Sequence, residues 1–118
     1  MRPRSYTPDR WVLVEIGTPE EMTMKVLGAF YGGFAGANSW KLSSGTMSVI
    51  EHEDRLEMPQ YSGSTYECFK NSYGLSSLTA ATLAGFKKDV EQINAMESDK
   101  PPVTIRVLDE AEALAYRG

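Results

Sequence analysis

The 118-residue sequence is poor in the residues from which most catalytic and metal centres are built. It contains one cysteine, Cys68, and one histidine, His52. A single cysteine excludes an internal disulfide framework and fits a reducing compartment. A metal site would need carboxylates or Cys68 beside His52, and no ligand spacing typical of zinc is present. We therefore expect no metal ion and no other cofactor.

Long hydrophobic runs are also absent. No apolar segment approaches the ~20 residues that a membrane-spanning helix needs. The arginines near the N-terminus, Arg2 and Arg4, are not followed by the apolar segment of a signal peptide. We therefore predict a cytoplasmic protein that does not contact the membrane.

Positive charge is scarce, with 12 Lys and Arg against 16 Asp and Glu and a net charge of −4. The one basic cluster, Arg2, Arg4 and Arg10, lies at the N-terminus and is interrupted by prolines. Binding to nucleic-acid phosphates needs clustered Lys and Arg, so nucleic acid is not the expected partner. Because chain ends are commonly loose, we predict that residues 1–8 form a flexible arm.

The composition that remains is typical of one globular domain. Hydrophobic residues make up 42% and charged residues 24% of the chain, close to the globular norm. A chain of this length buries enough surface for one core without disulfides. We expect a single domain over residues 1–118.

The first clear element is the β-branched apolar run at residues 10–16, which predicts a strand ended by Gly17. The next four residues, 18–21, have the pattern of a helix start. Thr18 is a good N-cap, proline suits the first helical position, and Glu21 completes a capping box.

The segment that follows supports two structures. Met22, Val26 and Phe30 are four residues apart, as on a helix face, whereas the alternating pattern over 24–30 is typical of a strand buried on both sides. Gly28 and the glycine pair after the segment weaken a helix. We predict a strand over residues 23–31, after at most one helical turn.

Short strands separated by turn signals continue as far as residue 71. The last of them alternates, which places Tyr66, Cys68 and Lys70 on one face and Glu67 and Phe69 on the other. This spacing indicates an antiparallel meander. The predicted strands cover residues 39–42, 46–52, 55–58 and 65–71, and the loops or turns cover 32–38, 44–45, 53–54 and 61–64.

The pattern then changes to that of a long amphipathic helix. Ser76 or Ser77 is a suitable N-cap, and the helix is expected to run to about Met96. Its apolar residues repeat at three- and four-residue steps: Thr79, Leu83, Phe86, Val90 and Ile93.

The C-terminal region predicts a strand over 103–108 and a short helix that begins after Asp109, with Glu112 completing a capping box. The predicted fold class is therefore α+β: an antiparallel β-meander sheet with one long amphipathic helix packed on one face and a C-terminal strand.

Residues 38–74 contain the candidate binding surface. They combine aromatic residues with two serine-glycine turns, Ser43-Ser44-Gly45-Thr46 and Ser62-Gly63-Ser64-Thr65. Aromatic side chains supply much of the contact area at protein interfaces, although the same residues suit the core and the hairpin turns of a small sheet. The first hypothesis is a recognition surface formed by Trp40, Tyr61 and Tyr66.

The second hypothesis is a site for a small anion at the Ser62-Gly63-Ser64 loop. Lys70 falls on the face of Tyr66 in the predicted strand and can reach this loop, where amides, hydroxyls and one ammonium group would bind the anion. Asn71 would hold further polar groups. The glycine-rich patterns of known phosphate-binding loops are absent.

Catalysis is less well supported than binding. Ser44, Ser62 or Ser64 could pair with His52, but none lies in the strand-turn-helix context of a nucleophile elbow. Cys68 could be activated by His52 or Lys70, but a lone cysteine between aromatic residues in a strand is usually a core residue. We predict no catalytic residue.

Three motifs carry a resemblance to a known group: Tyr31-Gly32-Gly33-Phe34, the run from Asn38 to Gly45, and the run from Tyr61 to Cys68. Over residues 9–74 the chain resembles short uncharacterised proteins encoded in tailed-phage genomes. The resemblance implies expression in a bacterial host cell and an accessory role, and it implies no particular activity.

Two functions are therefore expected. The first is a small non-enzymatic binding protein, a phage accessory factor that acts on a host protein in host takeover or anti-defence, or that self-associates. The alternative is a small-ligand or nucleotide-binding protein that uses the Ser62-Gly63-Ser64 loop and Lys70.

Overall fold

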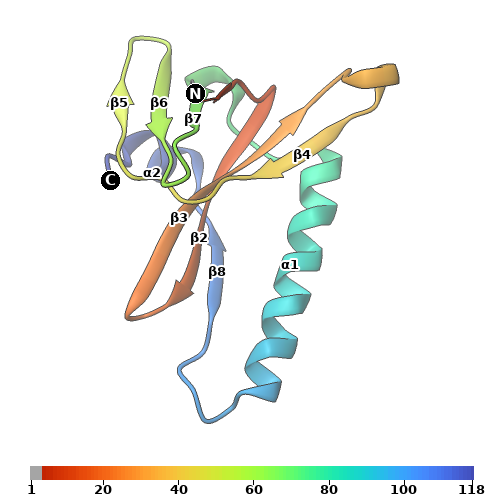
Figure 1. Cartoon of the computed structure of the whole chain (residues 1–118), viewed down its shortest axis with the longest axis vertical. Helices are drawn as coiled ribbons and strands as arrows, with labels where there is room; N and C mark the ends of the chain where they lie inside the picture. The colour runs from red at the N-terminus through yellow and green to blue at the C-terminus, as the bar shows by residue number, and fades with distance from the viewer. Residues whose placement is uncertain (1–3) are drawn as a thin grey trace.

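The computed structural model describes residues 4–118, which form an α+β fold as the sequence predicts (Figure 1). Its strands are β1 (Ser5–Tyr6), β2 (Arg10–Thr18), β3 (Glu21–Phe30), β4 (Ser39–Leu42), β5 (Ile50–Glu51), β6 (Arg55–Pro59), β7 (Thr65–Phe69) and β8 (Thr104–Val107). The helices are α1 (Ser77–Met96) and α2 (Glu110–Ala115), with short 3-10 turns at Phe34–Gly36 and Lys70–Ser72.

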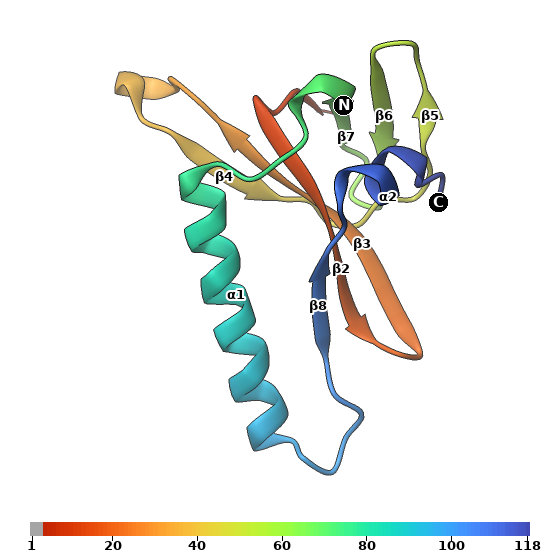
Figure 2. The same ribbon diagram turned by 180° about the vertical axis from the view of Figure 1, so that it is seen from behind.

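The strands are divided between two four-stranded sheets instead of forming one continuous meander. One sheet has the order β4-β3-β2-β8 and is antiparallel, and the other has the order β1-β7-β6-β5. In the second sheet β1 pairs with β7 in parallel, whereas the remaining pairs are antiparallel. Figures 1 and 2 show α1 on one side of the first sheet, with β5–β7 and α2 on the other.

The long hairpin of β2 and β3 is the centre of the fold, and its strands pair without a break from Arg10 opposite Ala29 to Thr18 opposite Glu21. The predicted strand over 23–31 is confirmed, whereas the predicted helical turn at 18–21 is wrong. Pro19 and Glu20 instead form the two-residue turn of the hairpin. Pairing along the whole length of β2 outweighs the local preference for a capping box.

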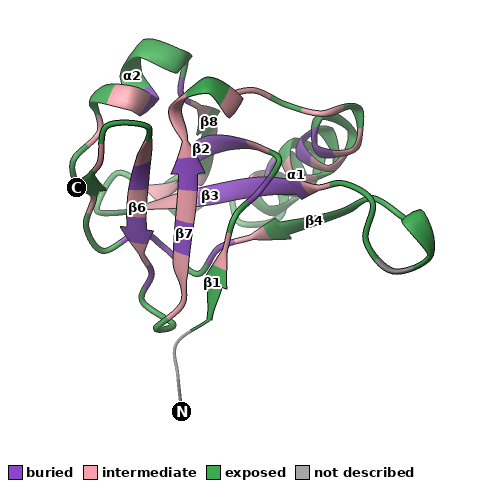
Figure 3. Ribbon diagram, turned by 90° about the horizontal axis from the view of Figure 1, so that it is seen from above, coloured by how far each residue is buried: buried purple, intermediate pink, exposed green. Residues whose placement is uncertain are grey.

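The core lies on both faces of β2 because alternate residues point to opposite sides of the strand. Trp11 and Leu13 pack against the second sheet, in a cluster that includes Leu56 and Cys68, and Figure 3 shows the buried centres of these strands. Val12 and Val14 lie on the opposite face of β2, in a second cluster that contains Leu83 of α1. The remaining members of both clusters are hydrophobic or aromatic. Burying each large aliphatic side chain contributes about 1.5–3 kcal/mol, so β2 stabilises both layers.

Helix α1 begins and ends where the sequence predicts. Ser76 is its N-cap and forms a reciprocal capping box with Thr79. The predicted apolar stripe is buried at Thr79, Leu83 and Val90, whereas Ile93 is 44% exposed. The C-terminal end is instead held by polar contacts: the side-chain amide of Asn94 donates to the carbonyl of Val103 and accepts from its amide, both at 2.8 Å. Asp109 and Glu112 form the second predicted capping box, at α2.

Residues 4–9 are attached to both sheets, which differs from the flexible arm that the sequence predicts for residues 1–8. Residues 1–3 lie outside the described part of the chain, but Ser5 and Tyr6 form β1 against β7. Pro8 is buried beside Gly28, and the amide of Asp9 donates to the carbonyl of Ala29 at 2.8 Å. The segment therefore joins the second sheet to β3.

Residues 43–46 carry the chain from the first sheet to the second and do not form a hairpin turn. The amide of Ser43 donates to Val26 and that of Thr46 to Met24, both on β3. Thr46 also forms an isolated bridge with Gln60 in the second sheet. The predicted strand over 46–52 is accordingly reduced to β5, because the first predicted residue belongs to the segment that connects the two sheets.

None of the helices in residues 4–118 combines the length and the apolarity that crossing a bilayer requires.

Candidate functional site

A pocket of about 420 Å³ lies where the two sheets meet, beside the N-terminal strand. Both serine-glycine segments contribute to it, together with residues of β1, β3, β4 and β7. We call it the serine pocket. Its lining residues are Tyr6, Lys25, Lys41, Leu42, Ser43, Ser44, Ser62, Ser64 and Tyr66.

The two serine-glycine segments are held together by the buried side chain of Gln60, which is 1% exposed. Its Oε1 accepts from the amide of Gly45 at 3.2 Å, and its Nε2 donates to Thr46 Oγ1 at 3.0 Å and to the carbonyl of Met58 at 2.9 Å. The amide of Tyr61 donates to the carbonyl of Gly45 at 2.9 Å. The side chain of Gln60 therefore joins the two serine-glycine segments, which the sequence predicts as two separate turns.

Three serine hydroxyls around the pocket accept hydrogen bonds from backbone amides. Ser43 Oγ accepts from Val26 at 2.8 Å, Ser44 Oγ accepts from Ser62 at 3.0 Å, and Ser62 Oγ accepts from Ser64 at 3.4 Å. A serine hydroxyl has one O–H donor as well as its acceptor sites. Within residues 4–118 none of the three donates to a protein acceptor. Ser43 is buried, whereas Ser44 and Ser62 are exposed, so the O–H groups of these two remain available to a bound molecule.

The amides of the second serine-glycine loop are already engaged within the protein. Ser62 donates to Ser44 Oγ, Gly63 donates to the carbonyl of Gln60 at 3.0 Å, and Ser64 donates to Ser62 Oγ. An anion at this loop would therefore be bound by hydroxyl and ammonium groups, and not by the loop amides that the sequence hypothesis invokes.

The pocket has two lysines, and neither is the one that the sequence predicts. Lys41 Nζ lies 5.1 Å from the centroid of the Tyr6 ring, in a cation–π contact, and Lys25 lines the pocket from β3. In the described chain, neither ammonium group forms an ion pair with a carboxylate. The positive charge at the pocket is therefore not neutralised by the protein.

Lys70 lies elsewhere because β7 ends one residue before it, and the chain turns into the 3-10 segment Lys70–Ser72. Lys70 Nζ donates to Glu51 Oε2 at 2.8 Å, and Glu51 also pairs with Arg117 at 3.0 Å. Hydrogen bonds from Lys70 and then Arg117 lower the pKa of Glu51. Asn71 is exposed beside this network, so neither Lys70 nor Asn71 lines the serine pocket.

Tyr66 is a wall of the pocket and not an exposed recognition residue, since it is only 4% exposed. Its ring lies 5.3 Å from that of Tyr6, and Phe30 meets Tyr6 edge-on at 6.4 Å. Burial raises the pKa of Tyr66 to about 12. The phenol is therefore neutral at physiological pH.

The other two residues of the predicted aromatic surface have separate surroundings. Trp40 is 41% exposed and its ring packs edge-on at 5.5 Å against Phe86 of α1. Tyr61 is 68% exposed and lines a smaller hollow of about 160 Å³ with Met47 and Tyr116. Trp40, Tyr61 and Tyr66 therefore do not form one continuous aromatic surface.

Of the residues considered for catalysis, Ser44, Ser62 and Ser64 line the serine pocket, whereas His52 and Cys68 lie outside it. His52 Nε2 is 2.9 Å from Glu57 Oε1. Cys68 is fully buried, and this burial raises the pKa of its thiol, which favours the unreactive protonated form. Among residues 4–118 no three His, Cys, Asp or Glu side chains are grouped so as to hold a metal ion.

Sequence reasoning found the serines of the pocket but missed Tyr6, Lys25, Lys41 and Gln60. Of these, Lys41 and Gln60 lie within the 38–74 segment, yet nothing in their local pattern marks them as site residues.

No protein-family model, curated protein or solved structure matches this chain.

Proposed function

We propose that this protein binds a small anionic molecule in the serine pocket. The observation that carries the proposal is the polarity of the lining. The ammonium group of Lys41 has no carboxylate partner in the described chain, and the exposed hydroxyls of Ser44 and Ser62 use their oxygens to accept hydrogen bonds from backbone amides. Ammonium groups are donors only, and such hydroxyls present their O–H groups. A ligand rich in acceptors and negative charge is complementary to such a surface.

The proposed ligand is bound by charge-assisted hydrogen bonds, each of which contributes about 1.5–3 kcal/mol. The protein as a whole carries a net charge of −4, so long-range attraction does not favour an anion. Recognition must come from local contacts, chiefly at Lys41, and we expect binding to weaken as salt is added.

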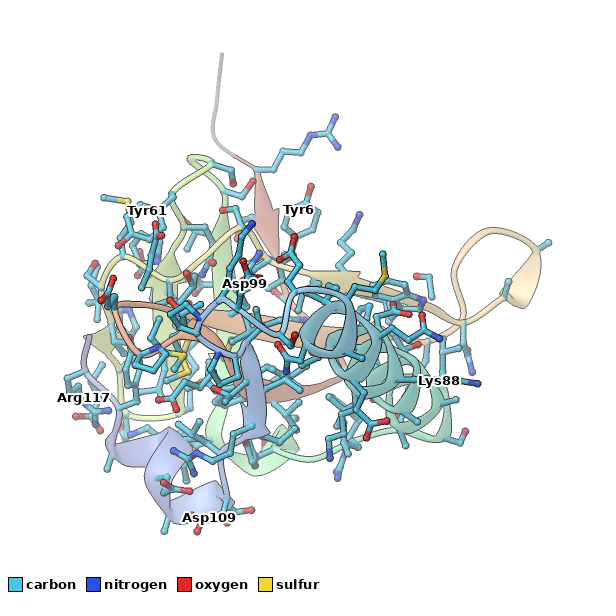
Figure 4. All side chains as sticks on the ribbon, turned by 90° about the horizontal axis from the view of Figure 1, so that it is seen from below. Tyr6, Tyr61, Lys88, Asp99, Asp109 and Arg117 are labelled. Carbon is cyan, nitrogen blue, oxygen red and sulfur yellow. The ribbon has the colours of Figure 1, made fainter. Side chains whose placement is uncertain are left out.

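The test is the thermal unfolding of the full chain with inorganic phosphate, pyrophosphate and citrate. Ligand at ten times its Kd stabilises by about 1.4 kcal/mol and raises the Tm by about 5 °C. Lys41→Met should weaken binding by about 10- to 100-fold, since it removes one charged donor. The matched control is Lys88→Met: Lys88 is exposed on α1, well away from Tyr6 in Figure 4.

Saturable stabilisation that Lys41→Met removes and Lys88→Met leaves unchanged would support the proposal. No stabilisation by any of the anions, or an equal loss in both variants, would refute it.

A second candidate is the protein-binding role in a bacterial host cytoplasm, as a phage accessory factor. The observation that favours it is the exposure of Tyr61, at 68%, beside Met47, at 54%. Rigid aromatic side chains of this kind are common binding hot spots. Tyr61→Ala should abolish capture of a host protein, whereas the control Tyr31→Ala, which alters another exposed tyrosine, should retain it. Equal capture by both variants would exclude this surface.

A further inference from the structure

We propose that the ligand of the serine pocket is a phosphate monoester with a hydroxyl-bearing aliphatic body, such as a sugar phosphate, and that no aromatic base is recognised. This inference rests on the anion-binding function proposed above. Three features of the pocket support it: its charge, its size with its hydroxyl lining, and the state of its aromatic rings.

The charge of the pocket matches a dianion. Lys25 and Lys41 come from neighbouring strands, β3 and β4, and both line the same pocket. A phosphate monoester carries about −1.5 to −2 charges at neutral pH and offers three acceptor oxygens. The ammonium group of Lys41 and the O–H groups of Ser44 and Ser62 are donors for these oxygens, so the donor groups of the pocket match such a dianion.

The size of the pocket calls for more than a phosphate group. Its volume of about 420 Å³ lies in the lower part of the range of about 300–1,000 Å³ that is typical of small-molecule sites. Beyond the lysines, the lining consists of serines and tyrosines, with Leu42 as its single aliphatic residue. Hydroxyl groups on the ligand body can exchange hydrogen bonds with the hydroxyls of Ser44, Ser62 and Ser64, which an apolar body cannot.

The aromatic rings of the pocket are already packed against other groups. Tyr6 contacts the ammonium group of Lys41 at 5.1 Å, the ring of Tyr66 at 5.3 Å and the edge of Phe30 at 6.4 Å. Tyr66 is only 4% exposed. A nucleobase contributes to binding affinity by stacking on an exposed face of an aromatic ring. These rings present no such face, so a base adds nothing to binding here.

Isothermal titration calorimetry of the full chain with ribose 5-phosphate, adenosine monophosphate, inorganic phosphate and ribose tests this inference. We expect ribose 5-phosphate to bind at least tenfold more tightly than inorganic phosphate. Adenosine monophosphate should bind no more tightly than ribose 5-phosphate, and ribose alone should give no saturable signal. Tighter binding of adenosine monophosphate, or equal binding of inorganic phosphate and ribose 5-phosphate, would overturn the inference and leave anion binding intact.

A serine variant tests the contribution of the hydroxyl lining. Ser62 is exposed and accepts only a long hydrogen bond of 3.4 Å, so Ser62→Ala leaves the loop in place. Ser62→Ala should weaken the binding of ribose 5-phosphate by about five- to tenfold. Ser48→Ala, which alters an exposed serine outside the pocket, should leave the affinity unchanged. Unchanged affinity in Ser62→Ala would overturn the role of the hydroxyls. If no phosphate compound binds the wild-type protein, anion binding itself fails, and this inference fails with it.

Discussion

Replacing Gln60 by leucine should separate the two serine-glycine segments with little change in side-chain volume. Gln60 is fully buried and makes three hydrogen bonds, to the amide of Gly45, the hydroxyl of Thr46 and the carbonyl of Met58. Leucine makes none of them. The amide of Gly45 is buried at this position and has no water to replace the lost acceptor.

The expected loss of stability is about 3–5 kcal/mol. Each intramolecular hydrogen bond contributes about 0.5–1.5 kcal/mol net, and a buried donor left without a partner costs about 1–3 kcal/mol more. The additional apolar surface of leucine offsets a small part of this loss. The remainder is a large fraction of the 5–15 kcal/mol by which ordinary domains are stable.

Equilibrium unfolding in urea, followed by tryptophan fluorescence, measures the change in free energy. Gln92→Leu is the matched control, because Gln92 is exposed on α1 and its replacement should change the stability by less than about 0.5 kcal/mol. A loss below about 1 kcal/mol in Gln60→Leu, or equal losses in the two variants, would refute the assigned role of Gln60. The Gln60 variant should also bind phosphate compounds more weakly where it remains folded.

Four further predictions concern stability and reactivity. Gly85→Ala should raise the free energy of unfolding by about 1 kcal/mol, because Gly85 lies in the interior of α1 and a Cβ there meets no atom within 4 Å. Gly45→Ala should lower it, because φ is +141° and the new Cβ would crowd two side chains. Burial raises the pKa of Tyr66 to about 12 from its ordinary value of 10, so its contribution to stability is complete below pH 10 and is lost as the pH rises to 12. The difference between the urea midpoints at pH 9 and pH 11 should therefore be smaller in Tyr66→Phe than in the wild type, and the part that remains includes the contribution of Tyr73, whose pKa is also raised to about 12. Cys68, whose thiol pKa is raised by burial, should react with a thiol reagent only after unfolding.

Each of these has an outcome that would contradict it, which for Gly45→Ala is a stability equal to or above that of the wild type. Destabilisation by Gly85→Ala would mean that the outer face of α1 is packed. A Tyr66→Phe variant as sensitive to alkali as the wild type would assign that sensitivity to other groups, and rapid labelling of native Cys68 would show that the core opens readily.

The parts of the fold that were predicted well are those set by neighbouring residues. The predicted N-cap at Ser76 and the predicted capping box of Asp109 with Glu112 mark the starts of α1 and α2, because the groups they bind are three residues away. The capping-box pattern at residues 18–21 predicts a helical turn that the structure does not contain, because those residues instead form the turn of the β2–β3 hairpin. There the competing interaction is the pairing of β2 with β3, and a local motif carries no information about that pairing.

The site was predicted in part for the same reason. Serine-glycine segments are visible in the sequence, but Tyr6 meets Tyr66 only through the parallel pairing of β1 with β7. Lys41 reaches Tyr6 only because β4 is an edge strand of the other sheet. Lys70 was chosen by extending strand alternation past Phe69, where the backbone turns. An error of two residues in the end of this strand thus selected a lysine that lies outside the pocket.

The two-residue strand β1 has a consequence for how the pocket forms. Ser5 and Tyr6 pair with Thr65 and Tyr66, sixty residues along the chain, through one of the shortest ladders in the molecule. Pairing β1 with β7 closes a large loop and gains few contacts. We therefore expect this pairing to form late in folding and to break first in unfolding. The pocket wall at Tyr6 is therefore expected to detach before the rest of the fold, and a ligand that contacts Lys41 and Tyr6 would stabilise the paired state of β1.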